Sequence, residues 1–257
     1  MTKQIKPGSR ELDACLLAEF PLLDYQRAWM LQKHLVQLRT SGRLQRDVLL
    51  MMEHRPVMTV GRRGAGQDLL VEEPELRARG IGIYHIERGG QVTYHGPGQL
   101  ILYPIFDLRA GRLRLTEFVH RLEEIMLRIA ADFGVRAERG ESNRGVFVED
   151  RKLGSLGVAV RRGVSYHGLA LNVAVDLSPF ELINPCGLAG IRMTSLDLES
   201  QAAVSLASAR RYAQYHVHSV FQRECRSVSP DWLEAMAGAE HDPEPQIPKS
   251  DAQAPLA

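Results

Sequence analysis

Cys186 is the side chain in this sequence best placed for covalent chemistry. It lies in the run Ile-Asn-Pro-Cys-Gly at residues 183–187, where a proline and a glycine constrain the backbone on either side of the thiol. Turns of this kind lie at the surface and at strand ends, where substrates arrive, whereas a thiol inside an apolar helical stripe is packed away. The sequence therefore predicts that Cys186 is a nucleophile.

Lys152 is the candidate partner of that thiol. It lies near the start of a predicted strand, and the chain leads from the neighbouring strand to Cys186, so the two side chains can meet across a sheet. A thiol at its ordinary pKa of about 8.5 is mostly protonated at neutral pH, and a nearby ammonium would raise the thiolate fraction. The same lysine, once desolvated, could act as a base. A solvated charge at a strand edge is the alternative interpretation.

A glycine-rich segment precedes both residues. Residues 88–99 read Arg-Gly-Gly-Gln-Val-Thr-Tyr-His-Gly-Pro-Gly-Gln, but their spacing matches neither the dinucleotide fingerprint nor the P-loop. The glycines would let backbone amides approach a ligand closely, or they would form two tight turns around a short strand. His95 in this segment and His167 on a later strand both lead toward Cys186, which favours a binding site.

Helices and strands alternate irregularly along the chain, which predicts an α+β fold with a mixed β-sheet flanked by helices. Apolar residues at helical spacing predict one helix that begins after Asp24 and ends at Gly42, and a second that begins after Thr116 and ends at Gly134. Strands are predicted at residues 48–52, 57–60, 82–86 and 100–106, and residues 152–160 and 165–175 are predicted to pair as neighbours.

Composition describes a globular protein of 257 residues with one sizeable core. We expect an N-terminal extension at residues 1–21, a catalytic domain at 22–237 and a disordered, proline-rich tail at 238–257. With 32 basic and 31 acidic side chains, the net charge of +1 argues against a nucleic-acid partner. The sequence has neither a long apolar run nor a secretory signal, so we expect a cytoplasmic protein that does not bind membranes.

The other cysteines have simpler explanations than Cys186. Cys15 lies in an apolar run and Cys225 follows an amphipathic one, so both are predicted to be small apolar core residues. None of the three cysteines has a second Cys or a His at the spacing of zinc ligands. We therefore expect no metal site.

Four segments in this order, residues 88–99, 152–157, 167–173 and 183–187, closely resemble the lipoyl(octanoyl) transferases over roughly residues 22–228. The resemblance implies the fold of the biotin and lipoate protein ligase catalytic domains. It also implies an acyltransferase that moves an octanoyl group from octanoyl-acyl carrier protein to the lysine of an apo lipoyl domain, the first step of lipoate biosynthesis. The acceptors would be the lipoyl domains of 2-oxoacid dehydrogenase complexes and the glycine cleavage H protein, and neither ATP nor metal would be required.

The resemblance also assigns roles to residues. Cys186 would carry the acyl group as a thioester, and Lys152 would lower the pKa of the thiol and relay protons. The acyl-binding wall would comprise Arg88, Gly89, Gly90, Gln91, Val92, Thr93, Tyr94, His95, Ser155, Leu156, Gly157, Gly168, Leu169 and Ala170. The sequence departs from the family at Leu188, close to the cysteine, where an aromatic residue is frequent.

Several alternatives remain open from sequence. An ATP-dependent lipoate or biotin ligase would share the fold but would not need Cys186. A catalytically silent binding protein would not need the pairing of Cys186 with Lys152, and a papain-like cysteine hydrolase would use His95. Arginines in predicted turns would either dock an acidic carrier protein or merely solvate their loops; these are Arg62, Arg63, Arg109, Arg112, Arg114, Arg161 and Arg162.

Overall fold

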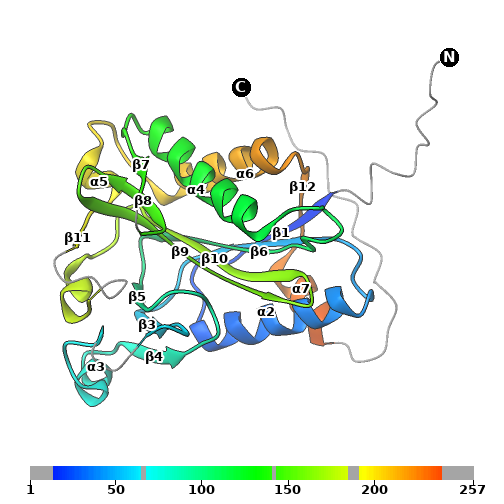
Figure 1. The fold of residues 1–257 in the computed structure, drawn as a ribbon, viewed down its shortest axis with the longest axis horizontal. Helices are drawn as coiled ribbons and strands as arrows, with labels where there is room; N and C mark the ends of the chain where they lie inside the picture. The colour runs from blue at the N-terminus through cyan, green and yellow to red at the C-terminus, as the bar shows by residue number, and fades with distance from the viewer. Residues whose placement is uncertain (1–13, 65–67, 141–142, 185–190, 239–257) are drawn as a thin grey trace.

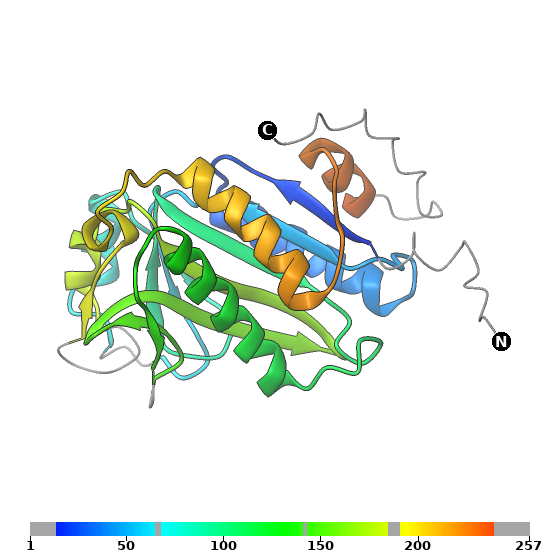
Figure 2. The ribbon, with the colours of Figure 1, turned by 90° about the horizontal axis from the view of Figure 1, so that it is seen from above.

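The computed structural model describes residues 14–64, 68–140, 143–184 and 191–238. A β-sheet crosses the middle of the molecule, with helices on both faces and a smaller sheet at one end (Figure 1). Seen from above, two long helices lie side by side over the near face of the sheet (Figure 2). The architecture is the mixed sheet flanked by helices that the sequence predicts.

Nine strands of the described residues form the main sheet. Their order is β12-β1-β2-β6-β10-β9-β8-β7, and β11 pairs with the start of β9 outside this order. The strands are β1 (Cys15–Glu19), β2 (Val48–Met52), β6 (Gln99–Ile105), β7 (Glu138–Arg139), β8 (Gly145–Val148), β9 (Arg151–Arg161), β10 (Val164–Asn172), β11 (Arg192–Met193) and β12 (Cys225–Ser227). The smaller sheet has the order β4-β3-β5, with β3 (Val57–Val60), β4 (Gly82–His85) and β5 (Val92–His95). Both sheets mix parallel and antiparallel pairs.

Two helical layers cover the main sheet. The helices are α2 (Tyr25–Thr40), α3 (Glu73–Ala78), α4 (Leu115–Asp132), α5 (Leu196–Glu199), α6 (Leu206–Phe221) and α7 (Pro230–Gly238), with a 3₁₀ helix η2 (Ser178–Leu182). One hydrophobic cluster joins α4 and α6 to one face of the sheet, and a second joins α2 and α7 to the other. The strands between the clusters are therefore apolar on both faces.

The strand β2 contributes side chains to the hydrophobic clusters on both faces of the sheet. Leu49 and Met51 belong to the cluster under α4, whereas Val48, Leu50 and Met52 belong to the cluster under α2. Successive side chains of a strand point to opposite faces, so burial on both faces requires an unbroken apolar run. The predicted bounds of this strand, residues 48–52, agree with the structure.

The two predicted helices form where their end signals place them. The Asp24 side chain caps α2 by accepting hydrogen bonds from the backbone N–H groups of Gln26 and Arg27, at 2.9 and 3.3 Å. Beyond α4, Gly134 adopts a left-handed conformation, as predicted for a residue that ends a helix. That helix begins at Leu115, slightly earlier than predicted.

The start of the sheet differs from the expected domain boundary. Residues 15–19, expected within an N-terminal extension ending at residue 21, form the buried strand β1, which pairs with β2 on one side and β12 on the other. Cys15 is fully buried there, as predicted for an apolar core residue, and Cys225 is its half-buried neighbour in register. A short apolar run near a chain end carries little periodicity, so only its pairing partners identify it as a core strand.

Two classes of feature are not found among the described residues. None of their helices is both long and apolar enough to cross a membrane. No group of three or more His, Cys, Asp or Glu side chains is arranged there as candidate metal ligands.

The N-cap of α2 offers a test of how firmly the helix is held. Replacing Asp24 by Ala removes the acceptor for two backbone N–H groups, and we expect it to lower the free energy of unfolding by about 1 kcal/mol. Asn at this position keeps an oxygen acceptor and should retain most of the stability. Urea denaturation of the two variants checks this, and equal losses would show that the cap does not stabilise α2.

Candidate active site

Two neighbouring strands bring predicted wall residues side by side as register partners. In the antiparallel pair of β9 and β10, Ser155 lies opposite Ala170, and Leu156 opposite Leu169. The third pair is Gly157 with Gly168. Two segments that are separate in sequence therefore form one continuous patch of wall.

The glycine-rich segment crosses β9 at this patch. The backbone N–H of Gly89 donates to the carbonyl of Val158 at 3.0 Å, and a Cβ on Gly157 would lie 2.6 Å from Cδ of Arg88. Any larger residue than glycine at position 157 would thus push the crossing segment away. Gly90 has a φ of +94°, which also requires glycine. These glycines let the segment lie close against β9, and bends at residues 87–91 and a turn at residues 97–98 flank the short strand β5, as in the second of the two interpretations.

The Arg88 side chain fastens this crossing to the smaller sheet. It is 7% exposed, and its guanidinium donates to the carbonyl and hydroxyl oxygens of Thr59 on β3, at 2.6 and 2.9 Å from Nη2. A third bond joins Nη1 to the carbonyl of Gly89 at 3.1 Å. A buried guanidinium needs such partners, so we assign Arg88 mainly to positioning the loop.

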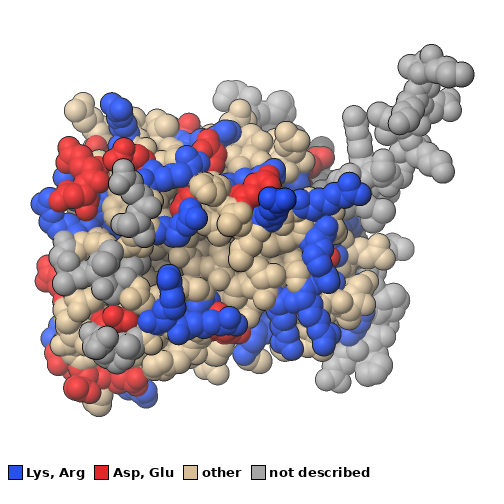
Figure 3. Space-filling model, in the orientation of Figure 1, with Lys and Arg blue, Asp and Glu red and all other residues tan. Residues whose placement is uncertain are grey.

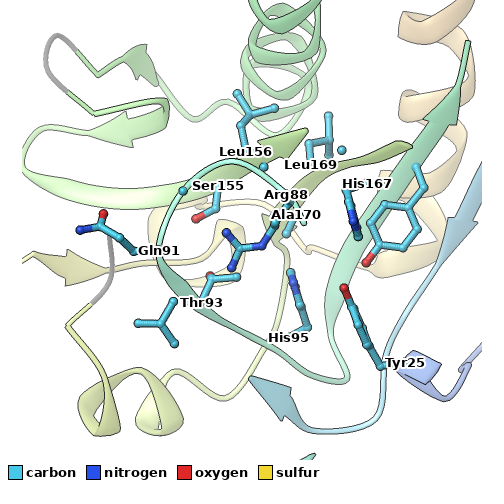
Figure 4. Close-up of a pocket in the computed structure, with 15 residues that line it drawn as sticks. Tyr25, Arg88, Gln91, Thr93, His95, Ser155, Leu156, His167, Leu169 and Ala170 are labelled. Atoms are coloured by element: carbon cyan, nitrogen blue, oxygen red, sulfur yellow. The ribbon is translucent and has the colours of Figure 1, made fainter. Parts of the chain in front are cut away.

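The crossing segment and the two strands enclose a narrow cavity (Figure 4). The space between its walls is about 480 Å³, part of it open to solvent. The lining residues are Tyr25, Arg88, Gly90, Gln91, Val92, Thr93, His95, Tyr103, Ser155, Leu156, Gly157, His167, Gly168, Leu169 and Ala170. Gln91 and Ser155 lie at one end of the cavity, and Tyr25 and His167 lie at the other (Figure 4).

Most of the predicted wall residues line this cavity, with two exceptions. Gly89 faces a neighbouring groove, and the Tyr94 ring packs edge to face on Phe180, at 5.4 Å between ring centres. Alternate side chains on β5 point to opposite faces, so Thr93 faces the cavity while Tyr94 faces the core. Tyr25 and Tyr103 also line the cavity, although the helical and strand patterns around them predict only core residues.

A chain of buried amides fixes the proton on His95. Asn172 donates from Nδ2 to the carbonyl of Thr194 at 2.8 Å, so its Oδ1 faces Nε2 of Gln99, also at 2.8 Å. The Oε1 of Gln99 therefore faces Nδ1 of His95 at 2.8 Å, and this nitrogen must carry the hydrogen. The Nε2 atom of His95 is left as the acceptor.

Two histidines that line the cavity, His95 and His167, and the neighbouring His54 are neutral at physiological pH. Burial, followed by the neighbouring His54, lowers the pKa of His95 to about 3. Burial also lowers the pKa of His54 to about 4, and that of His167, although Glu87 near the His167 ring acts in the opposite direction. At the end of the cavity where Tyr25 and His167 lie, the histidines are therefore polar but uncharged.

Lys152 is fully buried beside this cavity, three residues before Ser155 on β9. Its Nζ donates to the carbonyl of Arg144 at 3.0 Å and to Oδ1 of Asn143 at 3.4 Å, and lies 5.3 Å from the centre of the Phe147 ring. The expected alternative, a solvated edge charge, is therefore wrong. An amine held by fixed acceptors in a water-poor site is suited to moving protons.

Glu123, which sequence analysis did not single out, supports the loop that holds Lys152. This carboxylate on α4 is 1% exposed and accepts a hydrogen bond from the backbone N–H of Gly145 at 3.3 Å. Its second oxygen lies 3.7 Å from the Arg144 guanidinium. A glutamate within the apolar stripe of a helix was the available signal, since such residues are seldom buried without a partner.

Cys186, the predicted nucleophile, lies outside the described residues. The segment before it is held in place, because the backbone N–H of Asn184 donates to the carbonyl of Asp68 at 2.8 Å. After it, Met193 on β11 is the register partner of Lys152, and the N–H of Thr194 donates to the Lys152 carbonyl at 3.0 Å. The described chain therefore returns to Lys152 seven residues beyond the cysteine.

Structural comparison identifies the fold. A crystal structure of lipoate-protein ligase A bound with ATP superposes with a TM-score of 0.67 at 16% identity, covering 87% of this chain and 92% of that one. A putative lipoate protein ligase from T. acidophilum with bound lipoic acid gives 0.66 at the same identity, covering 87% and 92%. At these identities the likeness concerns the fold alone, which is the lipoate-ligase fold expected from the sequence.

Sequence comparison identifies the family. Residues 24–217 match the model of the lipoyl protein ligase A/B catalytic domain. An octanoyltransferase of Desulfotalea psychrophila is 50% identical over 186 residues, covering 72% of this chain and 83% of the relative. One from Syntrophobacter fumaroxidans is 39% identical over 225 residues, covering 88% and 98%. The chain therefore belongs to the lipoyl protein ligase A/B catalytic-domain family and, within it, to the octanoyltransferases, which are acyltransferases.

Proposed function

We propose that this enzyme transfers an octanoyl group from octanoyl-acyl carrier protein to the lysine of apo lipoyl domains, through a thioester on Cys186 and without ATP or metal. The acceptors are the lipoyl domains of 2-oxoacid dehydrogenase complexes and the glycine cleavage H protein. One observation carries the proposal: a narrow, largely apolar cavity whose wall continues along β9 to the buried amine of Lys152. Such a cavity suits an acyl chain, since each buried methylene contributes about 0.8 kcal/mol.

The first half-reaction moves the acyl group to the enzyme. The Cys186 thiolate attacks the thioester carbonyl, and the bond from this carbonyl to the sulfur of the carrier breaks. The leaving thiolate takes a proton from the Lys152 ammonium, so Lys152 becomes neutral. One thioester replaces another, so the step is nearly balanced in free energy and needs no nucleotide.

The second half-reaction returns the enzyme to its starting state. The neutral amine of the acceptor lysine attacks the octanoyl-Cys186 carbonyl, and the Cys186 thiolate leaves. Lys152 takes the proton that the new amide nitrogen must lose, which restores the ammonium. The acceptors that hold Nζ, the Arg144 carbonyl and the Asn143 side chain, can accept from either protonation state of Lys152.

The alternative function nearest to this proposal is that of an ATP-dependent ligase, because lipoate ligases share the fold of this chain. Such an enzyme activates a free acid and has no use for a nucleophilic thiol next to a buried lysine. The predicted Pro-Cys-Gly turn at residues 185–187 and the buried position of Lys152 both favour thioester exchange. Omission of ATP from the assay discriminates between the two functions.

A basic surface supports a docking role for part of the arginine set. Lys and Arg side chains crowd one side of the face seen in Figure 3, over the turn between β9 and β10 and the loop that follows β6. Arg161 and Arg162 are exposed in that turn, and exposed Arg109 packs against Gly163 beside them. We assign this surface to the acidic carrier protein, since complementary charge accelerates encounter.

The acyl-enzyme is testable by intact mass. After incubation with octanoyl-loaded carrier protein and no ATP, we expect the mass of the enzyme to rise by one octanoyl group, and Cys186→Ser to abolish this adduct. Cys225→Ser, at the half-buried cysteine of β12, is the matched control and should still form it. An adduct that persists in the Cys186 variant would reject the assigned nucleophile.

Lys152 is testable with a side chain of similar shape. Lys152→Met keeps the packing of the buried stem and removes the amine, and we expect the rate of octanoyl transfer to fall at least about 100-fold, as for loss of a general acid-base group. Circular dichroism should show an unchanged fold. Full transfer activity in this variant would exclude the proton-relay role.

The docking surface is testable through the ionic strength. We expect Arg161→Gln combined with Arg162→Gln to lower kcat/KM for octanoyl-carrier protein about three- to tenfold at low salt and to flatten its salt dependence. The control replaces Arg77 of α3 and its C-cap residue Arg79 by Gln, at the opposite end of the molecule (Figure 1). An unchanged salt slope in the first variant would mean that these arginines only solvate their turn.

A further inference from the structure

A second hollow lies beside the acyl cavity. It is an open groove of about 1090 Å³, lined by the first turns of α4, the glycine-rich crossing, β9 and the loop before β8. Gly90, Gln91, Leu156 and Gly157 line both the groove and the cavity. The two spaces are therefore separated only by a thin wall where the crossing segment passes over β9.

The groove reaches the partners of the catalytic amine. Asn143 and Arg144 line it, and these are the residues whose oxygens accept hydrogen bonds from Lys152 Nζ. A thioester extends in two directions from its carbonyl, with the acyl chain on one side and the thiol chain on the other. If the acyl chain occupies the cavity, the thiol chain must leave Lys152 by another path, and the groove begins there.

The charges of the groove favour an anion. Its lining includes two guanidiniums, Arg63 and Arg144, and none of its described lining residues is acidic. Glu123 lies 3.7 Å from the Arg144 guanidinium and offsets its charge, so Arg63 is the cation available to a ligand. The Arg63 side chain has no hydrogen bond or ion pair within the described part of the chain, while its backbone N–H is fixed to the Gly90 carbonyl at 3.1 Å. An approaching lysine would be repelled here, so the groove suits the donor and disfavours the acceptor.

The remaining lining matches a chain that is partly apolar. Leu115, which is 49% exposed, and Val119 stand on α4 opposite Val158 of β9. The Gln91 side chain and the glycine backbone add polar groups between them. This combination fits the pantetheine arm of a carrier protein, which has two amides, a dimethyl-substituted carbon and a phosphodiester at its far end.

We propose that this groove binds the phosphopantetheine arm of the acyl donor, with Arg63 contacting its phosphate. The proposal rests on octanoyl transfer from a carrier protein as proposed above. It assigns Arg63 to recognition of the arm itself, separately from the exposed arginines at the turn between β9 and β10.

Two small donors that differ only in the phosphate test this assignment without any carrier protein. Octanoyl transfer to an apo lipoyl domain is measured with S-octanoyl-4′-phosphopantetheine and with S-octanoyl-pantetheine. We expect Arg63→Gln to raise KM for S-octanoyl-4′-phosphopantetheine about tenfold, because one charge-assisted contact is lost. This KM should then approach the KM for S-octanoyl-pantetheine. KM for S-octanoyl-pantetheine and kcat for both donors should not change.

Arg136→Gln is the control, because this exposed arginine follows the C-terminal end of α4 whereas the groove lies at its N-terminal end. It should alter neither donor. Equal changes for both donors in Arg63→Gln, or no change for either, would overturn the phosphate site. Absence of transfer by the unaltered enzyme from these donors and from octanoyl-carrier protein would instead overturn the proposed function, and the site with it.

Discussion

The close contact between the glycine-rich crossing and β9 is the constraint on which the rest of the site depends. Only a missing side chain at Gly157 lets Arg88 pass at van der Waals distance, and the guanidinium of Arg88 then ties the crossing to Thr59 on the smaller sheet. This contact closes the cavity on one side and leaves the groove on the other. The passage of this one segment over β9 thus creates two hollows with a common wall.

The polar groups around the cavity divide into two sets with different states of charge. Burial keeps His54, His95 and His167 neutral, so the inner end of the cavity presents polar but uncharged groups to an acyl chain. Beyond Ser155 on β9, Lys152 is buried yet has oxygen acceptors, and the loop that supplies them is anchored by the carboxylate of Glu123. The neutral histidines and the buried amine are thereby kept apart in the structure.

A chain of hydrogen bonds connects His95 in the cavity wall to the strand that carries Lys152. The hydrogen bonds that fix His95 continue through Gln99 and Asn172 to the carbonyl of Thr194. The N–H of Thr194 in turn bonds the carbonyl of Lys152. A buried chain of hydrogen bonds holds its members in one geometry, because a displacement breaks bonds that water cannot replace. The strand carrying Lys152 is therefore positioned by the wall of the cavity.

The sequence by itself determined the main helices and the central strands, because periodicity and caps are local properties of the chain. The order of four motifs indicated the family, and the resemblance to that family implied most of the residues that line the cavity. Only the tertiary structure decided that β1 belongs to the sheet, that Lys152 is buried, and that Tyr25, Tyr103 and Glu123 contribute to the site. Each of these depends on contacts between residues far apart in sequence, and apart from the place of Glu123 in an apolar helical stripe, burial and pairing of that kind leave little local pattern.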